Sequence, residues 1–222
     1  MGCMDVFEDI RKRTISGDFA FGEKLRAEVL RNDYGCSAST VREALLRLAA
    51  LGLVEFQEQR GFRMPEYSQE RQHDITQMRI MLETEGACRS MRHGGVAWES
   101  RLNAAHHKLS HIESRIAAMG PTDELAELWM EAELEFHQTL LSACGSDILV
   151  ELHLQVYNRY RQIKAEYDRT FLHVADNIRE HQAIVDAALS GDEDTMRQRI
   201  LEHFKRHLTP GRTLSAPLTA LV

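Results

Sequence analysis

One stretch of the chain, residues 32–64, restricts the fold more than any other. Glycine readily takes the left-handed conformation that closes a helix, so we expect a helix to end at Gly35. Beyond a short polar turn, apolar residues recur every three or four positions up to Gly52, which indicates a second helix with one buried stripe: Val41, Ala44, Leu45, Leu48 and Leu51. Residues 53–56 then alternate like a strand, and residues 62–64 can return as its partner. The order predicts a winged helix-turn-helix.

The exposed face of that second helix carries chemistry that suits duplex DNA. Ser37 or Ser39 can cap its first turn, because either hydroxyl can accept from an unpaired backbone N–H. The remaining residues left to face outward include Thr40, Arg42 and Arg47, and the hairpin is tipped by Arg60-Gly61. A helix N-terminus favours phosphate, and short hydroxyls with arginine can reach base edges.

The charge balance differs between the two parts of the chain. Net charge is −7, yet residues 1–65 hold 10 Lys and Arg against 10 Asp and Glu, whereas residues 66–222 hold 17 against 24. The acidic excess therefore lies outside the candidate DNA-binding segment. Because that segment is neutral rather than basic, its phosphate contacts depend on where individual arginines stand.

Composition and targeting signals favour a cytoplasmic protein. No apolar run approaches the roughly 20 residues of a membrane span, and the first residues lack the pattern of a signal peptide. The four cysteines are scattered, with no C-x-x-C pair, as is typical of reduced, packed thiols. We expect no membrane partner.

The rest of the pattern is helical. A first amphipathic helix is expected from Val6 to an end at Ser16-Gly17, a turn-rich link follows, and the helix that Gly35 closes begins with Leu25. Pro65 and the polar residues after it mark the best boundary. We predict a mainly α fold: a winged helix-turn-helix DNA-binding domain over 1–67, then an all-α bundle of about six helices over 68–222.

Four ionisable residues are expected to point into that bundle. Glu133 and His137 lie one turn apart on the apolar face of one helix, and His181 and His203 lie on the apolar faces of two later helices. Lone buried acids and imidazoles are costly unless they are paired. One divalent transition metal would satisfy all four, with Zn²⁺ as the first choice and Ni²⁺, Mn²⁺ or Fe²⁺ as alternatives.

Two other interpretations of the histidines stay open at this point. A single inward histidine is more often a satisfied core residue, and the chain has 11 histidines in all. The cluster His106, His107 and His111 is a rival for the metal. Its neighbours Lys108, Ser110 and Glu113 indicate a solvated face instead.

The order of motifs resembles the GntR family of bacterial transcription regulators, in its FadR-like branch with the all-helical FCD ligand-binding domain. The first half carries the likeness in Gly22-x-x-Leu25, Tyr34-Gly35-Cys36-Ser37, Val41-Arg42-Glu43-Ala44-Leu45, Leu48, Gly52-Leu53-Val54 and Arg60-Gly61. The second half carries it in Arg79-x-x-Leu82-Glu83, Glu133-x-x-Phe136-His137, Glu180-His181-x-x-Ile184 and Gly191-Asp192 through His203.

This resemblance implies a metal site built from an acid, a histidine four residues later and two further histidines, which are again Glu133, His137, His181 and His203. It also implies a small organic acid held by the metal and by an arginine on the first helix of the domain, where Arg79 stands. We assign Arg79 and Asn177, on the face of His181, to this effector site. The alternative for Arg79 is an ion pair with Glu83, one turn on.

The chain departs from the family pattern at several positions. Many members have Arg where Ala38 stands, Pro at Thr40 and at Phe21, and Asp at Glu133. Losing Arg at Ala38 removes the usual base contact. The DNA contacts are therefore assigned to Ser37, Ser39, Thr40, Arg42 and Arg47, with Arg26 or Arg31 on phosphates and Arg60 and Gly61 at the minor groove.

The function predicted is a ligand-responsive regulator, a repressor, that binds a palindromic operator as a homodimer. A small carboxylate metabolite in the helical domain would alter operator affinity by favouring one arrangement of the dimer. A rival from another class is a metal-dependent enzyme acting on a small organic acid, although no general base stands with the four ligands. In a third hypothesis the metal stabilises the fold only and binds no effector.

Overall fold

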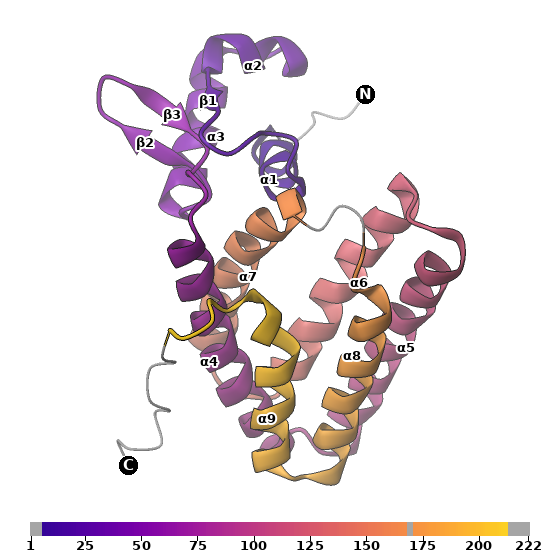
Figure 1. Cartoon of the computed structure of the whole chain (residues 1–222). Helices are drawn as coiled ribbons and strands as arrows, with labels where there is room; N and C mark the ends of the chain where they lie inside the picture. Colours follow the sequence, from indigo (N-terminus) through magenta and orange to yellow (C-terminus); the bar gives the residue numbers. More distant parts are fainter. Residues whose placement is uncertain (1–5, 168–170, 213–222) are drawn as a thin grey trace. The chain divides into compact units, whose positions relative to one another are not determined.

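The computed structural model describes residues 6–167 and 171–212, most of which are helical (Figure 1). These residues divide into two compact units. The N-terminal unit comprises residues 6–72 and 157–167, and the helical unit comprises residues 73–156 and 171–212. None of the helices in the described ranges is both long and apolar enough to cross a bilayer.

The N-terminal unit is a winged helix-turn-helix, as the sequence predicted. Its elements along residues 6–63 are α1 (Val6–Ser16), β1 (Lys24–Leu25), α2 (Ala27–Tyr34), α3 (Ala38–Ala50), β2 (Glu55–Gln57) and β3 (Gly61–Arg63). The three strands form an antiparallel sheet in the order β1-β3-β2, and β2 and β3 form the wing hairpin. The predicted apolar stripe of α3 supplies the centre of its core, where Val41, Leu45 and Leu48 are fully buried.

The turn between α2 and α3 follows the local signals. Gly35 takes the left-handed conformation (φ 59°), and its N–H donates to the carbonyl of Arg31, which closes α2. Ser37 caps α3: its Oγ accepts from the backbone N–H of Thr40 at 3.1 Å. Of the two serines that could cap, Ser37 therefore takes the role, which leaves the Ser39 hydroxyl out of the cap.

The link before α2 differs from the expectation. Leu25 lies in β1 and not in a helix, and α2 begins two residues later. Leu25 pairs with Phe62 of β3, and both side chains are buried. A strand of two residues is too short to show alternation, so its sequence resembles a loop.

After the wing, the described residues form six α-helices, as the sequence predicted. They are α4 (Gln69–His93), α5 (Gly95–Met119), α6 (Asp123–Leu141), α7 (Asp147–Tyr167), α8 (Val174–Ser190) and α9 (Glu193–Phe204), with a 3-10 turn η1 (Lys205–His207). Helix α5 packs against α6 and α8, and α8 packs against α9. The second half of α7 belongs to the N-terminal unit, where Gln162 Nε2 donates to the Leu53 carbonyl at 2.9 Å.

Candidate metal centre and nucleic-acid interface

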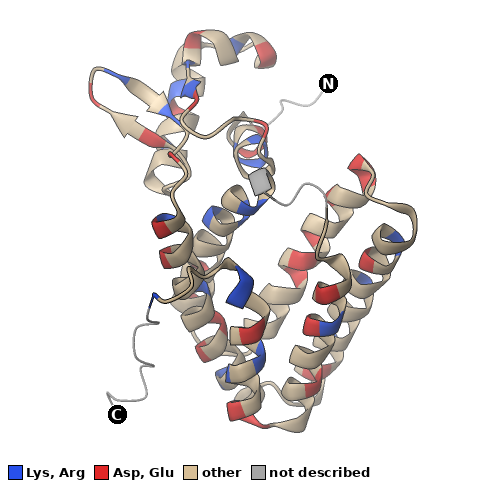
Figure 2. Cartoon of the chain, in the orientation of Figure 1, with Lys and Arg blue, Asp and Glu red and all other residues tan. Residues whose placement is uncertain are grey.

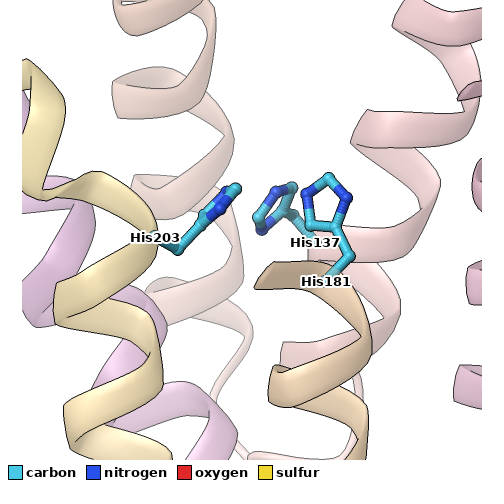
Figure 3. Close-up of side chains that lie close together, drawn as sticks. All are labelled: His137, His181 and His203. Atoms are coloured by element: carbon cyan, nitrogen blue, oxygen red, sulfur yellow. The ribbon is translucent and has the colours of Figure 1, made fainter. Parts of the chain in front are cut away.

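Three of the four predicted metal ligands meet inside the helical unit. His137 comes from α6, His181 from α8 and His203 from α9, and all three side chains are buried. One ring nitrogen from each lies within 4.8 Å of those of the others. The imidazoles converge from separate helices (Figure 3). Three histidine nitrogens that meet in one small space form a donor set that Zn²⁺ and other divalent transition metals prefer.

Each of these imidazoles is held from behind by a carboxylate. His137 Nδ1 donates to Glu83 of α4 at 2.8 Å, and His203 Nδ1 donates to Glu180 of α8 at 2.8 Å. His181 Nδ1 lies 3.2 Å from a carboxylate oxygen of Glu113 on α5. A carboxylate behind Nδ1 fixes the tautomer and turns the lone pair of Nε2 toward the centre, which is the arrangement seen behind metal-bound histidines.

The electrostatics keep the rings of His137 and His203 neutral. Burial lowers the pKa of His137 to about 4 and lowers that of His203 well below its usual value. Burial alone would raise the pKa of Glu83, but the guanidinium of Arg79 and the ring of His137 outweigh it and hold that pKa well below the usual range. At neutral pH the carboxylate is therefore ionised and these two imidazoles are uncharged, the form that can bind a metal.

The surroundings of the buried Nε2 of His181 show whether a metal would fit. Among the described residues it has no hydrogen-bond partner, although burying a polar atom without one is costly. A bound cation would satisfy it. Tetrahedral zinc with bonds of about 2.0–2.1 Å needs ligand nitrogens about 3.3 Å apart, and the three histidines each offer a ring nitrogen within 4.8 Å of the others.

Glu133 lies near the three histidines without joining them. Its side chain is buried one turn before His137, and its charge raises the pKa of that ring. In the described part of the chain, the group whose ligand atoms lie within 4.8 Å of one another consists of the three histidines alone.

Sequence reasoning missed the carboxylates behind the rings. The polar neighbours of the histidine cluster predicted a solvated face that includes Glu113, but Glu113 is fully buried, accepts from Trp129 Nε1 at 3.2 Å and supports His181. That interpretation is wrong. The only available signal was its spacing from Leu109, Ile112 and Ile116, which are buried on the same helix.

The structure places both predicted effector residues in ion-paired or hydrogen-bonded positions. Arg79 is fully buried, its Nε lies 2.5 Å from Glu83, and its guanidinium lies 4.5 Å from the ring centre of Phe204. The alternative ion pair is therefore present. Asn177 is buried and its Oδ1 accepts from Arg206 at 3.0 Å. Sequence reasoning did not single out Arg206, which also pairs with Glu180.

The rival histidine cluster does not converge. His107 and His111 are exposed on α5, as expected, whereas His106 is buried against Phe136, with 5.9 Å between ring centres. Within the described ranges, none of the three belongs to a group of potential metal ligands.

The N-terminal unit keeps its predicted DNA-binding hydroxyls and arginines at the surface. Ser37, Ser39, Thr40 and Arg42 are exposed at the start of α3. Arg42 also lies near the wing, with its guanidinium 5.7 Å from the ring centre of Phe62. These residues therefore share one end of a helix whose first-turn N–H groups favour an anion.

The other predicted contacts are placed differently. Arg26 is exposed at the start of α2, and Arg31 is exposed and lies 3.4 Å from Glu28. Arg47, toward the end of α3, stacks its guanidinium over the ring of Phe7 at 3.7 Å. Arg60 and Gly61 lie at the wing turn. Arg26, Arg31, Arg47 and Arg60 are all exposed, and Gly61 is half-buried.

Comparison with known proteins agrees with this architecture. The FCD domain family matches residues 74–206, and the family described as bacterial regulatory proteins, gntR family, matches residues 4–64. The solved structure of McbR/YncC from E. coli superposes with a TM-score of 0.73 at 19% identity, covering 92% of this chain and 93% of that one. A putative GntR regulator from Rhodococcus sp. RHA1 gives a TM-score of 0.70 at 22% identity, covering 90% and 92%.

Relatives of similar length are named as regulators. The HTH-type transcriptional regulator BphR of Paraburkholderia xenovorans is 34% identical over 92% of this chain and 82% of its own length. The transcriptional repressor GlaR of Escherichia coli is 29% identical over 89% and 92%, and the galactonate operon transcriptional repressor of the same species is 23% identical over 86% and 88%. The gntR family and these relatives are named as regulators, so the enzyme hypothesis does not hold. This chain belongs to the GntR family of DNA-binding bacterial transcription regulators and carries an FCD domain.

Proposed function

We propose that this regulator is a metal-dependent repressor that binds a small organic acid and acts as a homodimer on a palindromic operator. Residues 1–67 would form the DNA-binding domain and residues 68–222 the effector domain. The observation that carries the proposal is the buried group of His137, His181 and His203, each with a carboxylate behind its Nδ1. A carboxylate that accepts from Nδ1 is the usual partner of a metal-bound histidine.

The metal would be held by the three histidines, with Glu133 as the candidate for a fourth ligand. Zn²⁺ is the first choice, and Ni²⁺, Mn²⁺ and Fe²⁺ are alternatives. When bound, a divalent cation with an open coordination position takes a carboxylate oxygen. The acid's second anchor would be Arg79, whose buried guanidinium suits a carboxylate, with Asn177 beside His181 on α8 as a further contact.

Several features support a small hydroxylated or dicarboxylic acid as the effector class. A buried cationic group recognises an anion more strongly than a neutral molecule. One relative is named for the galactonate operon, and galactonate is a sugar acid. The effector would change operator affinity by binding one conformation of the dimer more tightly than the other.

On the DNA side, we propose that the start of α3 lies in the major groove. Ser37, Ser39, Thr40 and Arg42 would contact bases or nearby phosphates, and Arg60 and Gly61 would lie at the minor groove. Three further arginines would contact phosphates or border the site: Arg26, Arg31 and Arg47. A two-fold dimer would place two such helices on the two halves of a palindrome.

One experiment tests the effector and the metal together. The melting temperature of the purified full-length protein is measured against dicarboxylates and sugar acids, with and without a chelator, because a ligand that prefers the native state raises it. We expect chelation to lower the melting temperature and to remove the shift given by the effective acid. If chelation lowers it but no acid shifts it, the metal is structural. If chelation changes nothing, the metal proposal fails.

A further inference from the structure

The outer face of the wing sheet gathers positive side chains that the motifs did not reveal. Lys24 of β1 lies directly opposite Arg63 of β3, and Gln57 of β2 lies opposite Gly61. Residues opposite each other in an antiparallel pair share a face, and alternate residues along a strand do too. Lys24, Gln57, Gly61 and Arg63 therefore share one face, while the buried Leu25 and Phe62 occupy the other.

These residues border a cleft. It has a volume of about 220 Å³ and is lined by Lys24, Gln57, Arg60, Gly61 and Arg63. Three of its five lining residues are cations, and none is an acid. Glu55, which shares the face by register, does not line it. Figure 2 shows Lys and Arg, along with acidic residues, on this small sheet, in a segment (residues 1–65) whose overall charge is balanced.

Two local features suit this cleft to an anion. Gly61 has φ of 80° and carries no side chain, so the floor between the cations stays open. The nearest acid to Arg63 is Glu66, at 3.7 Å, with 31% and 69% of the two side chains exposed. An exposed pair at that distance contributes little, at most about 1 kcal/mol, so an incoming phosphate can replace it.

We propose that Lys24 and Arg63, together with Arg60, bind a backbone phosphate of duplex DNA in this cleft. The proposal deepens the proposed DNA-binding function and rests on it. Lysine serves as a point charge and arginine as a two-pronged donor to phosphate oxygens. Because a phosphate carries no sequence information, the cleft would fix the wing on the duplex and strengthen binding to every sequence alike.

The test uses the full-length protein and a duplex of mixed sequence, so it does not depend on knowing the operator. Affinity is measured by fluorescence anisotropy between about 50 and 200 mM salt, where log K falls with log salt in proportion to the phosphates neutralised. For the double variant Lys24→Ala with Arg63→Ala, we expect binding to weaken on the order of 10-fold at the low-salt end. The slope of log K against log salt should become shallower by about 1 for each DNA-binding domain that contacts the duplex.

Two control variants make the result specific. Arg11→Gln with Lys12→Gln removes the same charge from α1, where Arg11 already pairs with Glu8 at 2.7 Å, and we expect the wild-type slope. Lys24→Arg keeps the charge and should keep the slope too. An unchanged slope in the double variant overturns the cleft proposal and leaves DNA binding by α3 intact. Absence of binding by the wild-type protein at low salt instead overturns the proposed DNA-binding function itself.

Discussion

In the helical unit, three imidazoles and three carboxylates support one another, largely away from solvent, whereas the N-terminal unit keeps its functional cations exposed on a small scaffold. The apolar core of the N-terminal unit can be explained without any ligand, because Val41, Leu45 and Leu48 fill it. The helical unit cannot, because its core contains the uncompensated Nε2 of His181. Buried polar groups are costly unless they are satisfied, so the buried site in the bundle favours a bound cation that this nitrogen can coordinate.

The difference also determines how each site is recognised from structure. In the bundle, distances and hydrogen bonds identify the partners, since each ring has a carboxylate at 2.8–3.2 Å. On the N-terminal unit the exposed side chains have few fixed contacts, and their role follows from the element that carries them. Mutations should therefore act on different quantities: metal content and stability in one unit, DNA affinity and its salt dependence in the other.

The largest effect is expected from removing two histidines. His181→Ala with His203→Ala deletes two of three converging ligands, and we expect the purified protein to lose its bound metal. Elemental analysis after purification measures the metal content directly. The matched control is His107→Ala, an exposed histidine on α5, which should retain wild-type metal. Full metal content in the double variant would place the metal elsewhere.

The corresponding test of the N-terminal unit is the substitution Arg42→Ala, which removes a proposed DNA contact. A duplex selected from a random pool by the wild-type protein provides the operator for a mobility-shift assay. We expect a loss of about 1–3 kcal/mol in operator binding, because an arginine at a base edge contributes that much discrimination. Metal content should not change. Unchanged operator affinity would remove Arg42 from the DNA contacts.

A smaller effect on metal should follow from the carboxylate behind a ring. Glu113→Gln keeps the size of the side chain but removes the charge that holds His181 Nδ1. Partners of metal-bound histidines affect metal affinity by about 10- to 100-fold, and we expect a decrease in that range by competition with a chromogenic chelator. Glu135→Gln, on the exposed face of α6, is the control. Equal affinities for Glu113→Gln and wild type would show that this carboxylate serves only the fold.

The histidines were predictable because of helical periodicity. A spacing of three and four residues places His137, His181 and His203 on apolar faces, and the structure buries all three. The carboxylates behind them were not predictable in the same way. Glu113 follows His111 in a polar stretch, and Glu83 stands one turn after Arg79, so each has a local explanation that hides its long-range partner.

The N-terminal unit shows the opposite pattern. Its helices, cap and hairpin followed from local signals: Gly35, Ser37 and the alternation after Gly52. The cleft did not, because it depends on pairing between β1 and β3, some forty residues apart in the chain. Lys24 lies in a segment that resembled a loop, so no local pattern could have placed it opposite Arg63.

The smallest predicted effect separates the two roles of Ser37, which caps α3 and stands at its exposed start. Ser37→Ala removes the oxygen that accepts from Thr40 N, and we expect the free energy of unfolding to fall by about 1 kcal/mol. Ser37→Asp keeps a good cap, so stability measured by denaturant unfolding should stay within a few tenths of a kcal/mol of wild type. Its negative charge, however, would face a phosphate, and operator affinity should fall. Wild-type affinity in Ser37→Asp would mean that the start of α3 lies away from the DNA backbone, and the cap would then be the residue's whole contribution.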